Sequence, residues 1–182
     1  MGRLLFDYGD PKLTTLAFEL HDIVRPSGVV FYRARHEGGQ TLLEVLANTS
    51  TPVNQPLERL LIPDKTIGHL VVEMGQEIVI DDTLMHPLVR DSGAVHSMGI
   101  MAYLGVPCRL NGEVIGGISA VHQHRRSWSQ SDIDAARWAA RSYELIAQDR
   151  LERQMKKDWP ERDDPETSGP EKSGPETSGT EE

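Results

Sequence analysis

The chain has 182 residues, of which 38% are hydrophobic, and its net charge is −9. Nine acidic residues fall in residues 158–182 against only Arg162 and Lys172, so the rest of the chain has little net charge and no basic field for nucleic acid. The single cysteine, Cys108, excludes an internal disulfide and a cysteine-rich zinc site. No apolar run approaches the ~18 residues of a membrane span, and the N-terminus lacks a signal peptide's apolar core. We therefore expect a cytoplasmic protein with neither nucleic acid nor membrane as partner.

The first predicted element is an amphipathic helix over residues 11–24, with Pro11 in its first turn. Its apolar residues recur with helical spacing and form one stripe: Leu13, Leu16, Ala17, Leu20, Ile23 and Val24. Residues 28–34 and 41–47 are then predicted as two antiparallel strands joined by a polar turn. Residues 48–65 contain three prolines and are expected to form a long loop, with a turn of helix at Leu57–Leu61.

A second helix is predicted to begin after the capping residue Thr66 and to end at Gly75. A brief strand at Glu77–Ile80 follows it. Residues 83–98 have mixed polarity, no clear period and two histidines. A segment of this kind in front of a central strand is typical of the wall or lid of a pocket.

Residues 99–124 predict a long hairpin, because Asn111-Gly112 separates two alternating apolar runs and both residues suit a type I′ turn. Both faces of each strand are largely apolar, which is typical of central strands that are covered on each side. Pro107 is expected at a bulge or where strand pairing has ended. Small residues crowd the second strand and allow another backbone or a ligand to approach closely: Gly116, Gly117, Ser119 and Ala120.

A long helix is predicted to begin at Ser129 or Ser131 and to reach Lys157. Its apolar residues cover two faces, which indicates packing against the sheet and against another helix. That helix is either the one over residues 11–24 or its copy in a partner chain. Residues 158–182 repeat PETSG-like units, lack the apolar residues that a core needs, and predict a disordered tail after a single domain over residues 1–157.

Three stretches resemble the GAF domain family over a core of about residues 10–150. IGHLVVEMGQEIVIDDTLMHP (67–87) is similar to the family's helix and strand ending in an Asp turn and a Pro. YLGVPCRLNGEVIGGISAVH (103–122) is similar to its central hairpin, and SWSQSDIDAARWAA (127–140) to the entry into its last helix. The resemblance implies a GAF/PAS-like α+β fold with a central antiparallel sheet of five to six strands. The N- and C-terminal helices would lie on one face, and loops and short helices would cover a ligand pocket on the other.

The same resemblance implies a non-enzymatic sensory or regulatory domain. It would bind a small-molecule ligand, form a homodimer through its terminal helices and signal to a separate partner protein. The chain lacks the motif of cyclic-nucleotide-binding members, and Cys108 does not stand where bilin-binding members attach their chromophore. Members that reduce free methionine sulfoxide need more than one cysteine, so we expect no enzymatic activity.

Six residues are the candidate ligand contacts in this fold: His86, His96, Met98, Met101, Tyr103 and Tyr32. His96 stands shortly before the Gly-Val-Pro strand, where haem-binding members of the family carry an axial histidine. A first alternative is therefore a haem-based gas or redox sensor with His96 as its metal ligand. A second alternative is a dimerisation or adaptor module with an empty pocket. His122 and His124 point the same way on a strand, but no third metal ligand stands near them in the sequence.

Overall fold

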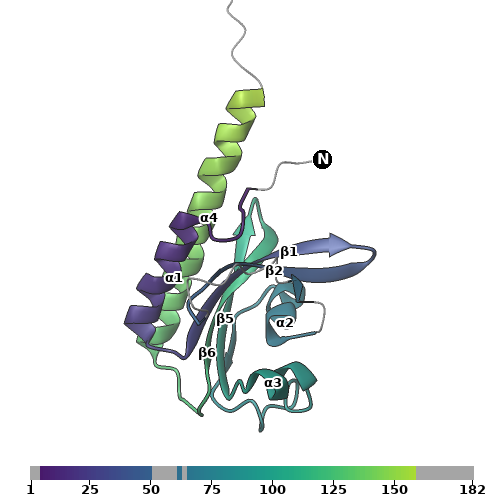
Figure 1. The fold of residues 1–182 in the computed structure, drawn as a ribbon, viewed down its shortest axis with the longest axis vertical. Helices are drawn as coiled ribbons and strands as arrows, with labels where there is room; N and C mark the ends of the chain where they lie inside the picture. Colours follow the sequence, from purple (N-terminus) through teal and green to yellow (C-terminus); the bar gives the residue numbers. More distant parts are fainter. Residues whose placement is uncertain (1–4, 51–60, 63–64, 159–182) are drawn as a thin grey trace, which may run out of the picture.

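A computed structural model describes residues 5–50, 61–62 and 65–158. All of the predicted tail except Asp158, which ends the last helix, lies outside the described residues, as does nearly all of the turn of helix predicted at Leu57–Leu61. The fold is one six-stranded antiparallel sheet, in the order β3-β2-β1-β6-β5-β4, with helices on both faces (Figure 1). The strands are β1 (Gly28–Glu37), β2 (Gln40–Asn48), β3 (Leu61–Ile62), β4 (Ile78–Ile80), β5 (Ala102–Leu110) and β6 (Glu113–His122). The helices are α1 (Pro11–Val24), α2 (Ile67–Met74), α3 (Gly93–Met98) and α4 (Gln130–Asp158). The predicted α+β architecture is confirmed.

Helices α1 and α4 pack together on one face of the sheet (Figure 1). Asp10 caps α1 by accepting hydrogen bonds from the backbone N–H groups of Lys12 and Leu13. Ser129 and Asp132 exchange side-chain to backbone hydrogen bonds at the start of α4, so the first of the two predicted caps is the one used. The apolar stripe of α1 meets the small residues of α4 and the sheet in one core: Leu13, Leu20, Phe31, Leu104, Ala136, Ala140 and Tyr143 among others.

The hairpin of β5 and β6 lies inside the sheet, with β6 in the middle beside β1 and with β5 beside the edge strand β4. Asn111 and Gly112 both have positive φ angles, 51° and 87°, as a type I′ turn requires. Strand β4 pairs with β5 only from Tyr103 to Gly105. Pro107 lies beyond this pairing, so its missing N–H removes no hydrogen bond between these two strands. A register shift follows directly, between Cys108 and Arg109.

Gly116 and Gly117 allow β1 to approach β6 unusually closely. A Cβ atom on Gly116 would lie 2.1 Å from the backbone oxygen of Tyr32. A Cβ atom on Gly117 would lie 2.7 Å from the hydroxyl oxygen of Tyr32, whose ring therefore rests on the sheet over that glycine. The crowding of small residues in the sequence thus corresponds to real close approaches.

A pair of oppositely charged side chains is buried next to the close approach of β1 and β6. Arg33 on β1 is 8% exposed and Glu44 on β2 is 1% exposed. The guanidinium donates to Glu44 Oε2 from Nε at 2.7 Å and from Nη2 at 2.5 Å, and it donates to the carbonyl of Phe6 from Nη1 at 2.7 Å. Because these bonds replace the lost hydration of both ions, the pair fixes β1, β2 and the segment before α1 together.

Helices α2 and α3 cover the opposite face (Figure 1). Helix α2 has the predicted bounds, and Gly75 ends it in the left-handed conformation. Helix α3 was not predicted, because its six residues are too few to show a helical period. In the part of the chain that the structure describes, no helix is both long and apolar enough to span a membrane.

Candidate functional site

A small pocket lies between the sheet and the two short helices, on the side predicted for a ligand. Its volume is about 90 Å³. Strands β1, β2, β5 and β6 form its floor, and α2, α3 and Ile100 form its cover. Its lining consists of Val30, Tyr32, Leu43, Thr66, Ile67, Gly68, Val95, Met98, Ile100, Tyr103, Ser119 and Val121. No Asp, Glu, Lys, Arg or His belongs to this lining, so the described pocket is uncharged.

Hydroxyl groups from three strands meet on the floor of the pocket. Tyr103 and Ser119 share a hydrogen bond with 2.5 Å between their oxygens. The hydroxyl of Tyr32 approaches both of them, yet among the described residues it has no hydrogen bond of ordinary geometry and is fully buried. A buried hydroxyl without a partner costs about 1–3 kcal/mol. The pocket therefore holds one polar group that is ready to bond to something else.

Two glycines position these rings. A Cβ atom on Gly105 would lie 2.6 Å from Cε1 of Tyr103, just as one on Gly117 would meet the hydroxyl of Tyr32. Because neither glycine carries a side chain, both rings lie down on the sheet and leave space beneath the helices. On α2, a Cβ atom on Gly68 would lie 2.9 Å from Cδ1 of Leu43, so that helix also sits close to the sheet.

Burial keeps both tyrosines protonated. Burial first, and the neighbouring Tyr103 second, raise the pKa of Tyr32 well above its usual value of 10. Burial raises the pKa of Tyr103 to about 12. At neutral pH both side chains are therefore neutral hydrogen-bond donors as well as acceptors.

The free energy of unfolding is expected to fall as the pH rises from about 10 to about 12. Below pH 10 Tyr103 is protonated in both the folded and the unfolded protein, so its contribution to the free energy of unfolding is fully present. Between the two values only the folded form keeps the proton, and stability falls by about 1.4 kcal/mol per pH unit for each such tyrosine. Urea denaturation across this range measures the slope, and Tyr103→Phe should make it shallower. An unchanged slope in that variant would show that Tyr103 titrates normally.

Three of the six residues predicted as ligand contacts line the pocket: Tyr32, Met98 and Tyr103. Ser119 supplies the third hydroxyl, although the sequence marked it only as a small residue. Its role depends on register, because β5 and β6 place Tyr103 and Ser119 on the same face two positions apart. Thr66, Ile67 and Gly68 were not among the predicted contacts, although short helices were expected to cover the pocket.

The other three predicted residues do not line the pocket. His96 is exposed on α3, and its Nε2 lies 2.7 Å from the carbonyl oxygen of Arg90. His86 lies in the turns before α3, with Nδ1 buried and without a hydrogen bond in the described structure. Met101 pairs through its backbone with His122 at the end of β6. Since His96 points away and about 90 Å³ is too small for a porphyrin, the residues present do not fit a haem.

Cys108 lies on the opposite face of the sheet. It is fully buried in the core shared with α1 and α4. Burial, together with the negative charge of Glu144, raises the pKa of its thiol well above the usual value. A protonated thiol in that core has no access to the pocket, so it supplies no nucleophile there. Within the described residues no group of three or more metal-ligating side chains occurs, so the pair of His122 and His124 lacks further ligands.

The family model of the GAF domain matches residues 10–145 of this chain. The chain belongs to the GAF domain family, and the resemblance in the three sequence stretches is confirmed. No curated protein matches it.

Several solved structures share the fold. The type II free methionine-R-sulfoxide reductase of Thermoplasma acidophilum is 17% identical, with a TM-score of 0.59 over 75% of this chain and 90% of the other. The GAF domain of an Acinetobacter phosphoenolpyruvate-protein phosphotransferase is 12% identical, with a TM-score of 0.60 over 75% and 80%. The cyanobacteriochrome receptor PixJ is 17% identical, with a TM-score of 0.58 over 74% and 91%. At these identities the likeness establishes the fold and not the ligand.

Proposed function

We propose that this chain is a non-enzymatic sensory domain that binds a small uncharged molecule in the pocket between the sheet and α2. The buried hydroxyl of Tyr32 carries the proposal. It approaches Ser119 and Tyr103 without a hydrogen bond of ordinary geometry, so a ligand that accepts a well-aligned hydrogen bond from it lowers an existing cost. The apolar lining disfavours a charged ligand, which would lose its hydration without gaining a counter-ion. The cyanobacteriochrome receptor PixJ and a domain of a two-component sensor histidine kinase protein from Sinorhizobium meliloti share the fold, which supports a sensory role.

The size of the pocket restricts the ligand further. An apolar cavity of roughly 150 Å³ holds benzene. The pocket of about 90 Å³ therefore suits a compact molecule of about three to five non-hydrogen atoms, with one strong acceptor and an apolar remainder. Acetone has this chemistry. Acetamide has the same shape and acceptor with an added NH2 group that can donate to the hydroxyl oxygens, whereas acetate has the same shape but a charge.

An NMR titration of the full chain with these three probes tests the proposal. Acetone and acetamide are expected to shift the resonances of Tyr32, Tyr103 and Ser119 saturably, and acetate is not. Tyr32→Phe should weaken binding about tenfold, because one hydrogen bond of about 1.4 kcal/mol is lost. Tyr8→Phe, outside the pocket, is the matched control. Binding that is equal for all three probes, or unchanged in Tyr32→Phe, would contradict the proposal, and no binding at all would favour the adaptor alternative.

The contacts at the end of α2 support a signal that passes to α4. The side chain of Arg109 donates to the carbonyl of Gly75 at 2.7 Å, and its backbone N–H donates to Glu144 on α4 at 2.7 Å. Glu77, two residues beyond Gly75, accepts two hydrogen bonds from Arg137 on α4, at 2.8 and 3.1 Å. A ligand that displaces α2 therefore acts on two connections to the helix that leaves the domain.

We also propose a homodimer through the terminal helices. Trp138 and Leu145 are 46% and 61% exposed, although both are large and apolar. They stand seven residues apart on α4 and so share one stripe, which is the spacing of a coiled-coil seam. A groove between α1 and α4 adjoins Trp138, so a second copy related by two-fold symmetry has a matching surface.

Light scattering after gel filtration is expected to give twice the chain mass. Trp138→Glu with Leu145→Glu should give the monomer mass, because two charges would be buried in the seam. Met85→Glu with Leu88→Glu is the matched control, since both residues are apolar and at least as exposed but lie outside α1 and α4. A monomeric wild-type chain would remove the dimer from the proposal.

A further inference from the structure

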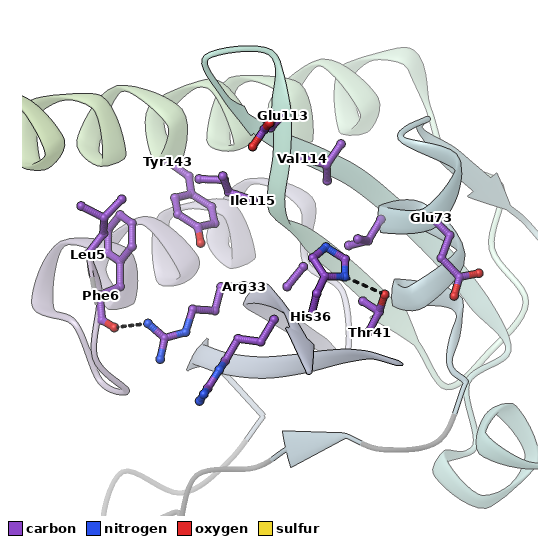
Figure 2. Close-up of a pocket in the computed structure, with 13 residues that line it drawn as sticks. Leu5, Phe6, Arg33, His36, Thr41, Glu73, Glu113, Val114, Ile115 and Tyr143 are labelled. Atoms are coloured by element: carbon purple, nitrogen blue, oxygen red, sulfur yellow. Dashed lines mark hydrogen bonds between the residues drawn. The ribbon is translucent and has the colours of Figure 1, made fainter. Parts of the chain in front are cut away.

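A second and much larger cleft opens where the two central strands of the sheet separate. The ladder between β1 and β6 ends at Arg33 and Gly116. Beyond it, residues 34–37 pair with β2, and residues 113–115 belong to the hairpin with β5. The cleft between the two arms has a volume of about 760 Å³ (Figure 2).

The inner edges of both arms are strand edges without a strand beside them in the described chain. The last pair between the two strands is Arg33 with Gly116. Strand β1 continues for four residues after Arg33, and β6 begins three residues before Gly116. Backbone groups on such an edge are a template for another strand. Proteins use edges of this kind to bind extended peptides, in which the main chain supplies affinity and alternate side chains supply specificity.

The walls of the cleft are fixed before anything binds. Figure 2 shows Arg33 bonded to the carbonyl of Phe6 on one side, with Tyr143 and Ile115 above it. The ring of Phe6 packs edge-on against Tyr143 with 5.1 Å between centroids. An extended segment therefore meets a preformed apolar wall, which lowers the entropic cost of binding.

The charges that remain free in the cleft are negative. Arg33 is neutralised by Glu44, and Arg35 pairs with Glu37 and lies 3.6 Å from Glu44. Glu73 has only a 3.8 Å contact with the well-exposed Lys65. Glu113, on the opposite arm, has no ion pair among the described residues. An occupant with a positive charge complements these two carboxylates.

We infer that the cleft binds an extended segment of a separate protein, which adds as a strand to the β1 edge at residues 34–37. Side chains of such a strand point alternately to the two faces of the sheet. One set contacts the apolar wall of Phe6, Ile115 and Tyr143. The other set faces Val72 and Glu73 on α2, where a lysine or arginine of the bound segment forms an ion pair with the carboxylate of Glu73. This surface is separate from the small-molecule pocket and does not depend on it.

A displayed library of random peptides of about nine residues, selected on the full chain, tests this inference. The expected selection is an alternating apolar sequence with one basic residue, and its binding should slow hydrogen exchange at residues 34–37. Methylation of alternate backbone nitrogens of the peptide should weaken binding tenfold or more, since only a strand needs those N–H groups. Glu73→Lys with Glu113→Lys should weaken it at least tenfold, whereas Glu152→Lys on the outer part of α4 should not.

Three results would overturn the inference. The first is a library without enrichment, and the second is a selected peptide that tolerates methylation at every nitrogen or ignores the two charge reversals. The third is protection of residues 34–37 that rises with protein concentration when no peptide is present, because this would assign the cleft to a second copy of the chain.

Discussion

Glu44→Ala is expected to lower the free energy of unfolding by about 3–5 kcal/mol, because it leaves the charge of Arg33 buried without its carboxylate. Arg33 is held between two strands and the carbonyl of Phe6, so it cannot turn to solvent without releasing the segment before α1. Urea denaturation followed by circular dichroism measures the loss. The same variant should also loosen the wall of the large cleft.

The double variant Arg33→Met with Glu44→Leu distinguishes the cost of an unpaired buried charge from the net contribution of the intact ion pair to stability. Replacing both ions with apolar side chains of similar volume removes the unpaired charge, so most of the lost stability should return. A double variant as unstable as Glu44→Ala would show that packing, and not the uncompensated ion, determines the loss.

Gly116→Ala is expected to destabilise the fold by about 3 kcal/mol or more, because its Cβ atom would lie 2.1 Å from a backbone oxygen of β1. A backbone cannot move aside without opening the ladder between the two central strands. The loss is measured by the same denaturation experiment.

Gly117→Ala is the matched comparison, one residue further along the same strand. Its Cβ atom meets chiefly the side chain of Tyr32, together with a backbone oxygen at 3.0 Å, so the neighbours can yield more easily. We expect a smaller loss of stability, together with weaker acetone binding, since the ring of Tyr32 is pushed into the pocket. Equal destabilisation by both alanines would contradict the close backbone approach at Gly116.

The local features of the fold were predictable from the sequence because their causes are local. The apolar stripe and Pro11 give α1, Asn111-Gly112 gives the hairpin, and the small residues of β6 indicate a close approach. Helix α3 was missed because six residues show no period. Strand β3 was missed because its two residues depend on pairing with β2.

The site was less predictable, because register and not spacing assembles it. Tyr103 was expected to contact a ligand, but its bond to Ser119 follows from the pairing of β5 with β6. His96 looked like a metal ligand from its place in the chain, yet the turn of α3 directs it to the carbonyl of Arg90. The pair of Arg33 and Glu44 gave no local signal, since eleven positions separate the two residues.

The most direct test of the small-molecule site is the measurement of intermolecular nuclear Overhauser effects with acetone in saturating amount. The account predicts contacts from the acetone methyl protons to the ring protons of both Tyr32 and Tyr103, and their loss in Gly117→Ala. Contacts to other parts of the chain, with none to either ring, would contradict it.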